Sequence, residues 1–248
     1  MHLTVMTFNI QHGVDYERRL REPAASDVDL IDLDRVARAV KPFDPDILSL
    51  NEVRDASFEP GFSAQARFLS EMLRLPYYYF GEALAAGNRG PYGNALLSRY
   101  PFRNIETVLI PDAPRTRTHG RYETRCLIKA DLETPVPLRV MNTHFGLEPE
   151  EAENAVRTVL ANTAMDDRPA LLMGDFNLEP DSPILQPLFR TYRDSALLLP
   201  DKSFSYPSDA PEIKIDYILG RGTLTFTRAD LPALVVSDHC PYLAEIEI

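Results

Sequence analysis

Carboxylates and imidazoles stand beside short apolar runs in the second half of this chain. The segment Leu-Met-Gly-Asp-Phe-Asn contains Asp175 and Asn177, Lys-Ile-Asp-Tyr-Ile-Leu contains Asp216, and Ser-Asp-His-Cys-Pro contains Asp238 and His239. Apolar runs of this length are typical of buried strands, and a rigid sheet holds the side chains at its strand ends in fixed positions. Brought together, such groups can bind a divalent cation and move protons. The chemistry that they indicate is phosphoester hydrolysis.

Earlier strands of the sequence end in the same kind of group. Asn9 ends the run Thr-Phe-Asn, Glu52 ends Leu-Ser-Leu-Asn-Glu, and His144 follows a run that begins at Leu138. A single polar residue at a strand end is more often part of a turn, but the same arrangement on five strands favours a functional site. The amide and carboxylate oxygens of Asn9 and Glu52 suit magnesium, manganese or calcium better than zinc.

The elements that must position these groups are predicted to form mixed, largely antiparallel sheets with helices outside them, because strands first alternate with helices and then follow one another from 92 to 143. The predicted helices have apolar faces within 30–40, 62–73 and 152–160. The predicted strands are 3–10, 47–53, 77–80, 95–98, 107–110, 126–132, 138–143, 170–173, 215–219 and 242–248. No linker or repeat divides the chain, so one α/β domain over residues 1–248 is expected.

Composition excludes several classes of protein. The 37 acidic and 26 basic residues give a net charge of -11, which opposes non-specific binding to nucleic acid, although a local basic cleft stays compatible with it. Cys126 and Cys240 are too few for a disulfide framework and are expected to be reduced. There is no leader-like N-terminus and no apolar run of bilayer length, so we expect a cytoplasmic protein with no membrane and no obligate protein partner.

A series of motifs along nearly the whole chain resembles the endonuclease/exonuclease/phosphatase superfamily. The resemblance implies a four-layer sandwich, in which two mixed six-stranded sheets lie face to face with helices on both outer sides. It also implies magnesium-dependent phosphoester hydrolysis. The motifs are Thr7-Phe8-Asn9, Asn51-Glu52, Gly93-Asn94-Ala95-Leu96-Leu97-Ser98, Asn142-Thr143-His144, Gly174-Asp175-Phe176-Asn177, Ile215-Asp216-Tyr217 and Ser237-Asp238-His239.

The resemblance also implies ligands for the cation. Carried over to this sequence, Asn9, Glu52 and Asp238 would hold Mg²⁺, with Mn²⁺ or Ca²⁺ as alternatives, directly or through water. No cofactor beyond the metal is expected.

The same resemblance implies catalytic roles for five residues. Asp175 would orient and deprotonate the attacking water, and Asn177 would hydrogen-bond the phosphate. His239 would stabilise charge on the phosphoryl oxygens, with its ring fixed by a hydrogen bond to Asp216, while His144 would contact the phosphate from the other side. An unpartnered carboxylate in an apolar strand is costly, which independently predicts the pairing of Asp216 with His239.

Substrate contacts are expected from Arg125, where many family members carry a phosphate-facing arginine, and from Asn94. Two basic clusters could be solvated surfaces or could attract an anionic substrate, and the sequence leaves both interpretations open. One cluster is Arg18, Arg19 and Arg21, and the other is Arg115, Arg117, Arg121 and Arg125 with His119 among them.

The resemblance leaves the substrate open, because the superfamily includes nucleases, inositol-phosphate phosphatases, sphingomyelinases and deadenylases. Abasic-site endonucleases typically show Tyr-x-Pro-Asn where this chain has Asn-Thr-His-Phe from Asn142, and they favour Met at the position of Phe176. These two departures disfavour a role in abasic-site repair. The chain also lacks Trp and a secretion signal, which disfavours an extracellular sphingomyelinase. A small or flexible intracellular phosphodiester or phosphomonoester is the predicted substrate. A nuclease acting on DNA or RNA is the alternative, and a non-catalytic binding module is less favoured because no site residue is missing.

Overall fold

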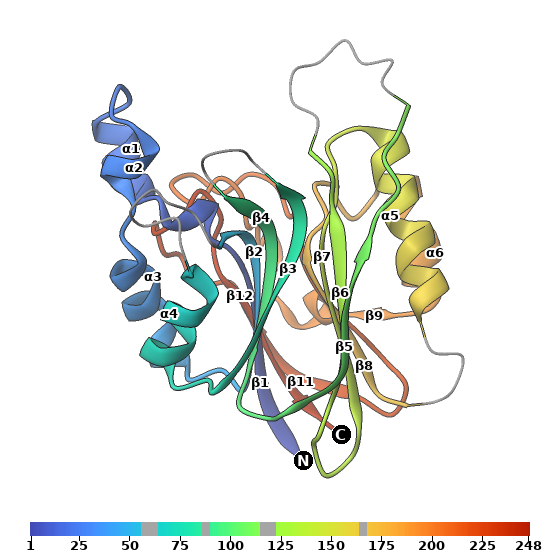
Figure 1. Ribbon diagram of the computed structural model, residues 1–248. Coiled ribbons are helices and arrows are strands. Elements are labelled where there is room, and N and C mark those ends of the chain that lie inside the picture. Colours follow the sequence, from blue (N-terminus) through green and yellow to red (C-terminus); the bar gives the residue numbers. More distant parts are fainter. Residues whose placement is uncertain (56–63, 86–89, 115–122, 164–167) are drawn as a thin grey trace.

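Two six-stranded sheets lie face to face in the computed structural model, which describes residues 1–55, 64–85, 90–114, 123–163 and 168–248 (Figure 1). The first sheet contains β1 (His2–Asn9), β2 (Ile47–Arg54), β3 (Tyr77–Ala85), β4 (Pro91–Ser98), β11 (Thr225–Asp230) and β12 (Tyr242–Glu247), in the order β11-β12-β1-β2-β4-β3. The second contains β5 (Phe102–Leu109), β6 (Cys126–Leu132), β7 (Leu138–His144), β8 (Ala170–Asp175), β9 (Arg193–Asp194) and β10 (Asp216–Arg221), in the order β5-β6-β7-β8-β10-β9. Only β1 with β2 and β7 with β8 pair in parallel among these strands. The prediction of mixed, mainly antiparallel sheets is confirmed.

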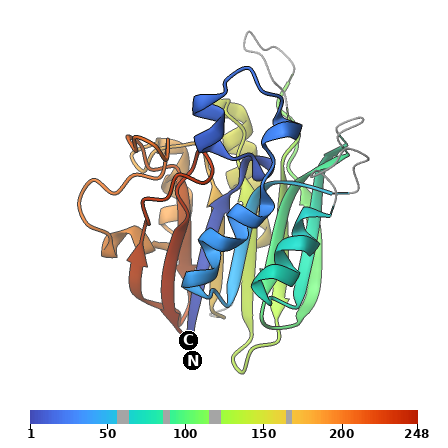
Figure 2. The ribbon, with the colours of Figure 1, turned by 90° about the vertical axis from the view of Figure 1, so that its left-hand side faces the viewer.

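Helices cover the outer face of each sheet, as both views show (Figures 1 and 2). On the side of the first sheet lie α1 (Tyr16–Arg21), α2 (Asp27–Leu30), α3 (Leu33–Val40) and α4 (Gln65–Leu73), and on the side of the second lie α5 (Pro149–Asn162) and α6 (Gln186–Phe189). The predicted four-layer sandwich is therefore confirmed.

The apolar side chains form one core between the sheets and one under each helical layer. Along β1, Leu3 and Val5 belong to the core between the sheets, whereas Met6 and Phe8 pack with residues of α3 and α4. A strand buried on both faces reads as a continuous apolar run, which is why the central strands could be predicted from sequence.

Some elements differ from the prediction. The edge strand β11 is not among the predicted strands, because its sequence, Thr-Phe-Thr-Arg-Ala-Asp, is largely polar and exposed, with only Ala229 buried. The helix predicted over 30–40 is two helices, because Ile31 is extended and the Asp32 side chain accepts a hydrogen bond from the Arg35 N–H at 2.8 Å, which starts α3 anew.

Phe62, predicted to open the next helix, lies outside the described residues, and that helix is described from Gln65. No helix in the described ranges is long and apolar enough to cross a membrane.

Three buried asparagine side chains join the two sheets near one end of the sandwich. The Asn51 Nδ2 atom of β2 lies 2.9 Å from Asn94 Oδ1 of β4 and 3.0 Å from Asn142 Oδ1 of β7. Asn142 Nδ2 in turn donates across the sandwich to the carbonyl oxygens of Leu50, at 3.0 Å, and Ala95, at 2.8 Å. Buried amides of this kind fix the spacing and register of the two sheets, because each donor and acceptor needs its partner.

We expect Asn142→Leu to lower the free energy of unfolding by about 2–4 kcal/mol, because two buried carbonyl groups and the Asn51 amide lose hydrogen bonds. Urea unfolding measures the change. The matched control is Asn162→Leu at the half-buried end of α5, which should cost less than about 1 kcal/mol because water can replace its partners. Equal losses in the two variants would contradict a special role for the buried amides.

Candidate active site

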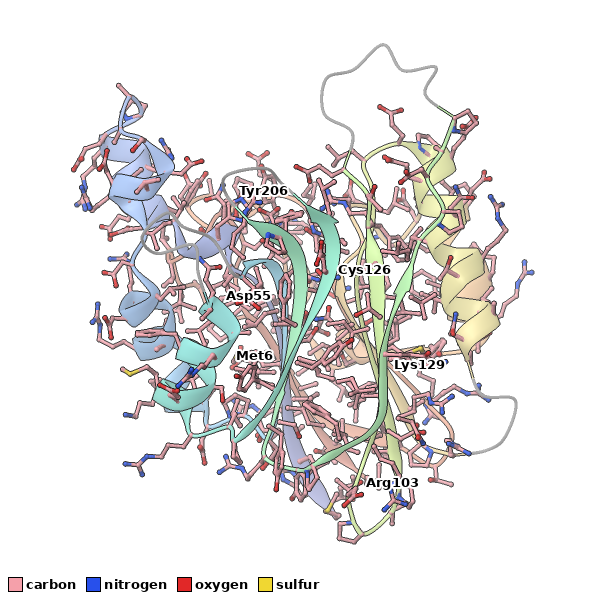
Figure 3. The ribbon with its side chains drawn as sticks, viewed as in Figure 1. Met6, Asp55, Arg103, Cys126, Lys129 and Tyr206 are labelled. Carbon is pink, nitrogen blue, oxygen red and sulfur yellow. The ribbon has the colours of Figure 1, made fainter. Side chains whose placement is uncertain are left out.

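A cavity of about 640 Å³ opens at the end of the sandwich where β1, β2, β7 and β8 terminate. Tyr206 marks this end of the molecule, and Arg103 lies at the opposite end (Figure 3). Most of the predicted site residues line the cavity, namely Glu52, Arg125, His144, Asp175, Asn177, Asp238 and His239. The side chains of Asn9 and Asp216 are buried and do not line the cavity, but Asn9 contacts Asp175 and Asp216 contacts His239.

Glu52 reaches the cavity because strand β2 bulges at this point. The register of β2 against β4 shifts between Leu50 and Val53, and Glu52 adopts a φ of 56°. A bulge changes the direction of the side chains that follow it, and a left-handed backbone is uncommon at residues other than glycine. Asn51 faces the other sheet by regular alternation with Ile47, and the bulge then brings Glu52 to the cavity.

Asp175 is held by the close approach of β8 to β7. Gly174 has a φ of +139°, and a Cβ atom at this residue would lie 1.8 Å from the Thr143 carbonyl oxygen, so only glycine fits. The Asp175 main-chain N–H donates to Asn51 Oδ1 at 3.0 Å, and its carboxylate accepts a hydrogen bond from Asn9 Nδ2 at 3.1 Å. Burial raises the pKa of Asp175, so this carboxylate is more basic than an exposed one.

His239 lies on one side of Asp175 and forms the predicted pair with Asp216. The distance between His239 Nδ1 and Asp216 Oδ2 is 2.8 Å, which confirms that hydrogen bond, and His239 Nε2 lies 3.5 Å from Asp175 Oδ2. Burial alone would lower the pKa of His239, but the Asp216 and Asp175 carboxylates outweigh it and raise this pKa to about 10. At neutral pH the ring is therefore an imidazolium.

His144 lies on the other side, with its Nε2 atom 3.4 Å from Asp175 Oδ2. Asn177 links Asp175 to the segment that follows β7. Its main-chain N–H donates to Asp175 Oδ1 at 2.9 Å, and its side-chain amide donates to the Phe145 carbonyl at 3.0 Å. Burial, with Arg125 nearby, lowers the pKa of His144 well below its usual value. The two imidazoles flanking Asp175 thus carry different charges.

Oxygen donors suited to a hard cation gather next to Asp175, with Asn9 between Asp175 and Glu52. Asn9 Nδ2 lies 3.2 Å from Glu52 Oε1, and Gln11 Nε2 lies 3.0 Å from Asp238 Oδ2. Burial raises the pKa of Asp238 to about 6, with Glu52 adding to the rise although His239 opposes it. Gln11 Oε1 is buried without a hydrogen-bond partner among the described residues. Two adjacent carboxylates and an unsatisfied amide oxygen are the surroundings that a divalent cation would stabilise.

A second set of groups could also hold a metal. Ligand atoms of Asp175, Asp216 and His239 lie within 4.8 Å of one another, and all three residues are buried. In the structure His239 Nδ1 is hydrogen-bonded to Asp216 Oδ2 at 2.8 Å, so these two residues engage each other.

Asn94, from which a substrate contact is predicted, lies away from the cavity. Its amide is bonded to Asn51 and to the Cys126 carbonyl at 3.1 Å, so the predicted contact with substrate has no support. Cys126 lies between the sheets as a free, buried thiol, and Cys240 is also free (Figure 3).

The predicted basic clusters supply few free charges among the residues that the structure describes. Arg18 pairs with Glu22, Arg21 with Glu17, and Arg19 with Asp27. In the second cluster Arg125 pairs with Glu123, and the other members, Arg115, Arg117, His119 and Arg121, lie outside the described residues.

Several residues that line the cavity have no role predicted from the sequence, namely Gln11, His12, Tyr92 and Tyr206. Tyr206 packs its ring against His239 with the ring centres 4.9 Å apart, and Tyr92 contacts the Arg125 guanidinium. The one available signal was the Gln-His-Gly sequence directly after Asn9 and Ile10, which forms a short 3₁₀ turn (Gln11–Gly13) at the cavity.

We expect Asp216→Asn to lower the pKa of His239 below the value of about 10, because a neutral amide no longer offsets the burial of the ring. An NMR titration of the metal-free protein, following the imidazole nitrogens, measures this shift. Asp230→Asn, on the exposed strand β11, is the control and should leave the titration unchanged. An unaltered pKa in Asp216→Asn would contradict the electrostatic coupling.

Comparison with known proteins agrees with this architecture. The sequence pattern of the endonuclease/exonuclease/phosphatase family matches residues 6–239. The uncharacterized protein YbhP of Escherichia coli K12 is 27% identical over 261 residues, covering 98% of this chain and 96% of YbhP.

Solved structures have the same fold. A family structure from Beutenbergia cavernae has a TM-score of 0.75 at 23% identity, and the match covers 100% of this chain and 72% of that chain. The mannosyl-6-phosphatase Bt3783 of Bacteroides thetaiotaomicron has a TM-score of 0.76 at 16% identity and covers 99% and 100%. The chain belongs to the endonuclease/exonuclease/phosphatase family, whose members are hydrolases that act on phosphoesters.

Proposed function

We propose that this protein is a divalent-metal-dependent phosphoesterase that hydrolyses a phosphodiester or phosphomonoester of a small or flexible substrate. The observation that carries the proposal is the position of Asp175, whose buried carboxylate lies 3.4 Å and 3.5 Å from two imidazole nitrogens in one cavity with Glu52 and Asp238. Phosphoryl transfer needs an oriented water and positive charge around the phosphoryl oxygens, and these groups can supply both.

Asp175 would orient the attacking water and accept its proton, a role that its raised pKa favours. His239, as an imidazolium held by Asp216, would stabilise the negative charge that develops on the phosphoryl oxygens. His144 and Asn177 would donate hydrogen bonds to the same phosphate from the side of β7. These groups would act mainly because they are held in the correct positions around the phosphate, which is what phosphoryl transfer requires.

The donor set fits a hard cation such as Mg²⁺, with Mn²⁺ or Ca²⁺ as alternatives, held by Asn9, Glu52 and Asp238. When bound, the cation would neutralise charge on the phosphoryl oxygens and help to position the substrate. Gln11 would support this set through its hydrogen bond to Asp238.

The cavity favours a small substrate over a polymer. Among the described lining residues, Arg19 is paired with Asp27 and Arg125 with Glu123, so no continuous basic surface leads to the site. A polyanion needs such a surface, and the net charge of -11 opposes its approach. The similarity in fold to a mannosyl-6-phosphatase is consistent with a small phosphomonoester.

The test is a hydrolysis screen with magnesium or manganese against sugar phosphates, inositol phosphates, bis(p-nitrophenyl) phosphate, single-stranded DNA and RNA. We expect turnover of a small ester, loss of turnover with chelator, and recovery when metal is added back, because oxygen ligands hold these cations weakly. Turnover of DNA or RNA in preference to every small ester would favour a nuclease. Full activity after exhaustive chelation would contradict metal dependence.

Glu52→Gln is expected to weaken metal binding at least tenfold by calorimetry, because one ligand charge is lost, while thermal stability without metal changes little. The matched control is Glu82→Gln on the exposed face of β3, which should bind metal normally. A large loss of stability in metal-free Glu52→Gln would indicate a structural role for this carboxylate.

A further inference from the structure

Both ring nitrogens of His144 face nitrogen donors. Nδ1 lies 3.1 Å from Arg125 Nη1, and Nε2 lies 3.0 Å from Asn177 Nδ2. A neutral imidazole has one N–H donor and one acceptor nitrogen, so it cannot accept a hydrogen bond from both neighbours. One neighbour must therefore determine which nitrogen carries the proton.

We propose that Arg125 is a positioning residue that holds His144 as the neutral tautomer with its proton on Nε2. A guanidinium has no acceptor atom, so the nitrogen next to it has to be the unprotonated one. Asn177 constrains the ring less, because a hydrogen bond from a neutral amide is weaker than one from a guanidinium cation, and this amide keeps the Phe145 carbonyl at 3.0 Å as an acceptor. The Nε2 proton then lies near the Asp175 carboxylate, whose Oδ2 atom is 3.4 Å from Nε2.

Arg125 is itself fixed in place. Its Nη1 atom also lies 3.1 Å from the Tyr92 hydroxyl, and its Nη2 atom lies 3.1 Å from Glu123 Oε2. The side chain is only 10% exposed. An arginine that binds phosphate directly would present its N–H groups to the cavity, whereas this guanidinium directs most of them to protein groups. The low pKa of His144, caused by burial and by Arg125, agrees with a neutral ring.

The consequence rests on the function proposed above. With its proton on Nε2, His144 presents a neutral donor toward Asp175 and a phosphate bound beside it, while His239 presents a cationic donor. Without Arg125, the Asn177 amide would become the stronger constraint, and the proton would move to Nδ1. The Nε2 lone pair would then face the phosphoryl oxygens and repel them. Arg125 would thus act on the reaction through His144.

Nitrogen-15 NMR of metal-free protein labelled in histidine tests this directly. We expect His144 of the wild type to show a protonated Nε2 and an unprotonated Nδ1, and Arg125→Met to show the opposite. With p-nitrophenyl phosphate or bis(p-nitrophenyl) phosphate, whichever is turned over, kcat of Arg125→Met should fall about a hundredfold, and KM should change less. Arg99→Met removes an arginine that pairs with Asp44 and Asp46 at the surface, and it should alter neither measurement.

A protonated Nδ1 in the folded wild type would overturn the proposal, and this result needs no variant. An unchanged tautomer in Arg125→Met would overturn it as well. If neither ester is hydrolysed, the tautomers still decide the role of Arg125, so failure of the proposed function and failure of this inference are separable.

Discussion

The hydrogen bonds of the Asn51 side chain connect the two sheets at the point where the catalytic groups meet. Its Nδ2 atom donates to the Asn142 side chain of the second sheet, and its Oδ1 atom accepts from the Asp175 main chain. Asn51 faces the second sheet by the ordinary alternation of β2, as Ile47 does, and the bulge that follows it turns Glu52 toward the cavity. Neighbouring residues of β2 therefore position a proposed metal ligand, Glu52, and the main chain of the proposed base, Asp175. Each buried amide also has to be satisfied for the sandwich to close.

Electrostatics around Asp175 follow from this geometry. Two sheets packed face to face bury the carboxylates of Asp175 and Asp216, and burial of this kind is costly without partners. His239 supplies a positive charge between them, whereas His144, beside the Arg125 guanidinium, stays neutral. The site therefore combines a basic carboxylate, a cationic donor and a neutral donor, each determined by its neighbours. Raised or lowered pKa values of this kind are common where proton transfer and charge stabilisation are needed.

The sequence predicted the parts that depend on local pattern. Strands buried on both faces, such as β1 and β8, are continuous apolar runs, and a carboxylate within such a run, as at Asp216, implies a partner. Edge strands such as β11 lack that pattern. The roles of Asn51, Gln11 and the neighbours of His144 depend on contacts between sheets, which no periodicity along the chain encodes. The same holds for Asn94, because a motif cannot show that its amide faces Asn51 and the core.

The most direct test of the account is anomalous diffraction from crystals of the protein grown with Mn²⁺. We expect an anomalous peak coordinated by Glu52 and Asp238, with Asn9 as a direct or water-mediated ligand, and an intact hydrogen bond between His239 and Asp216. A peak bound instead by Asp175, Asp216 and His239 would contradict it, because the groups proposed to move protons would then be the ligands of the metal.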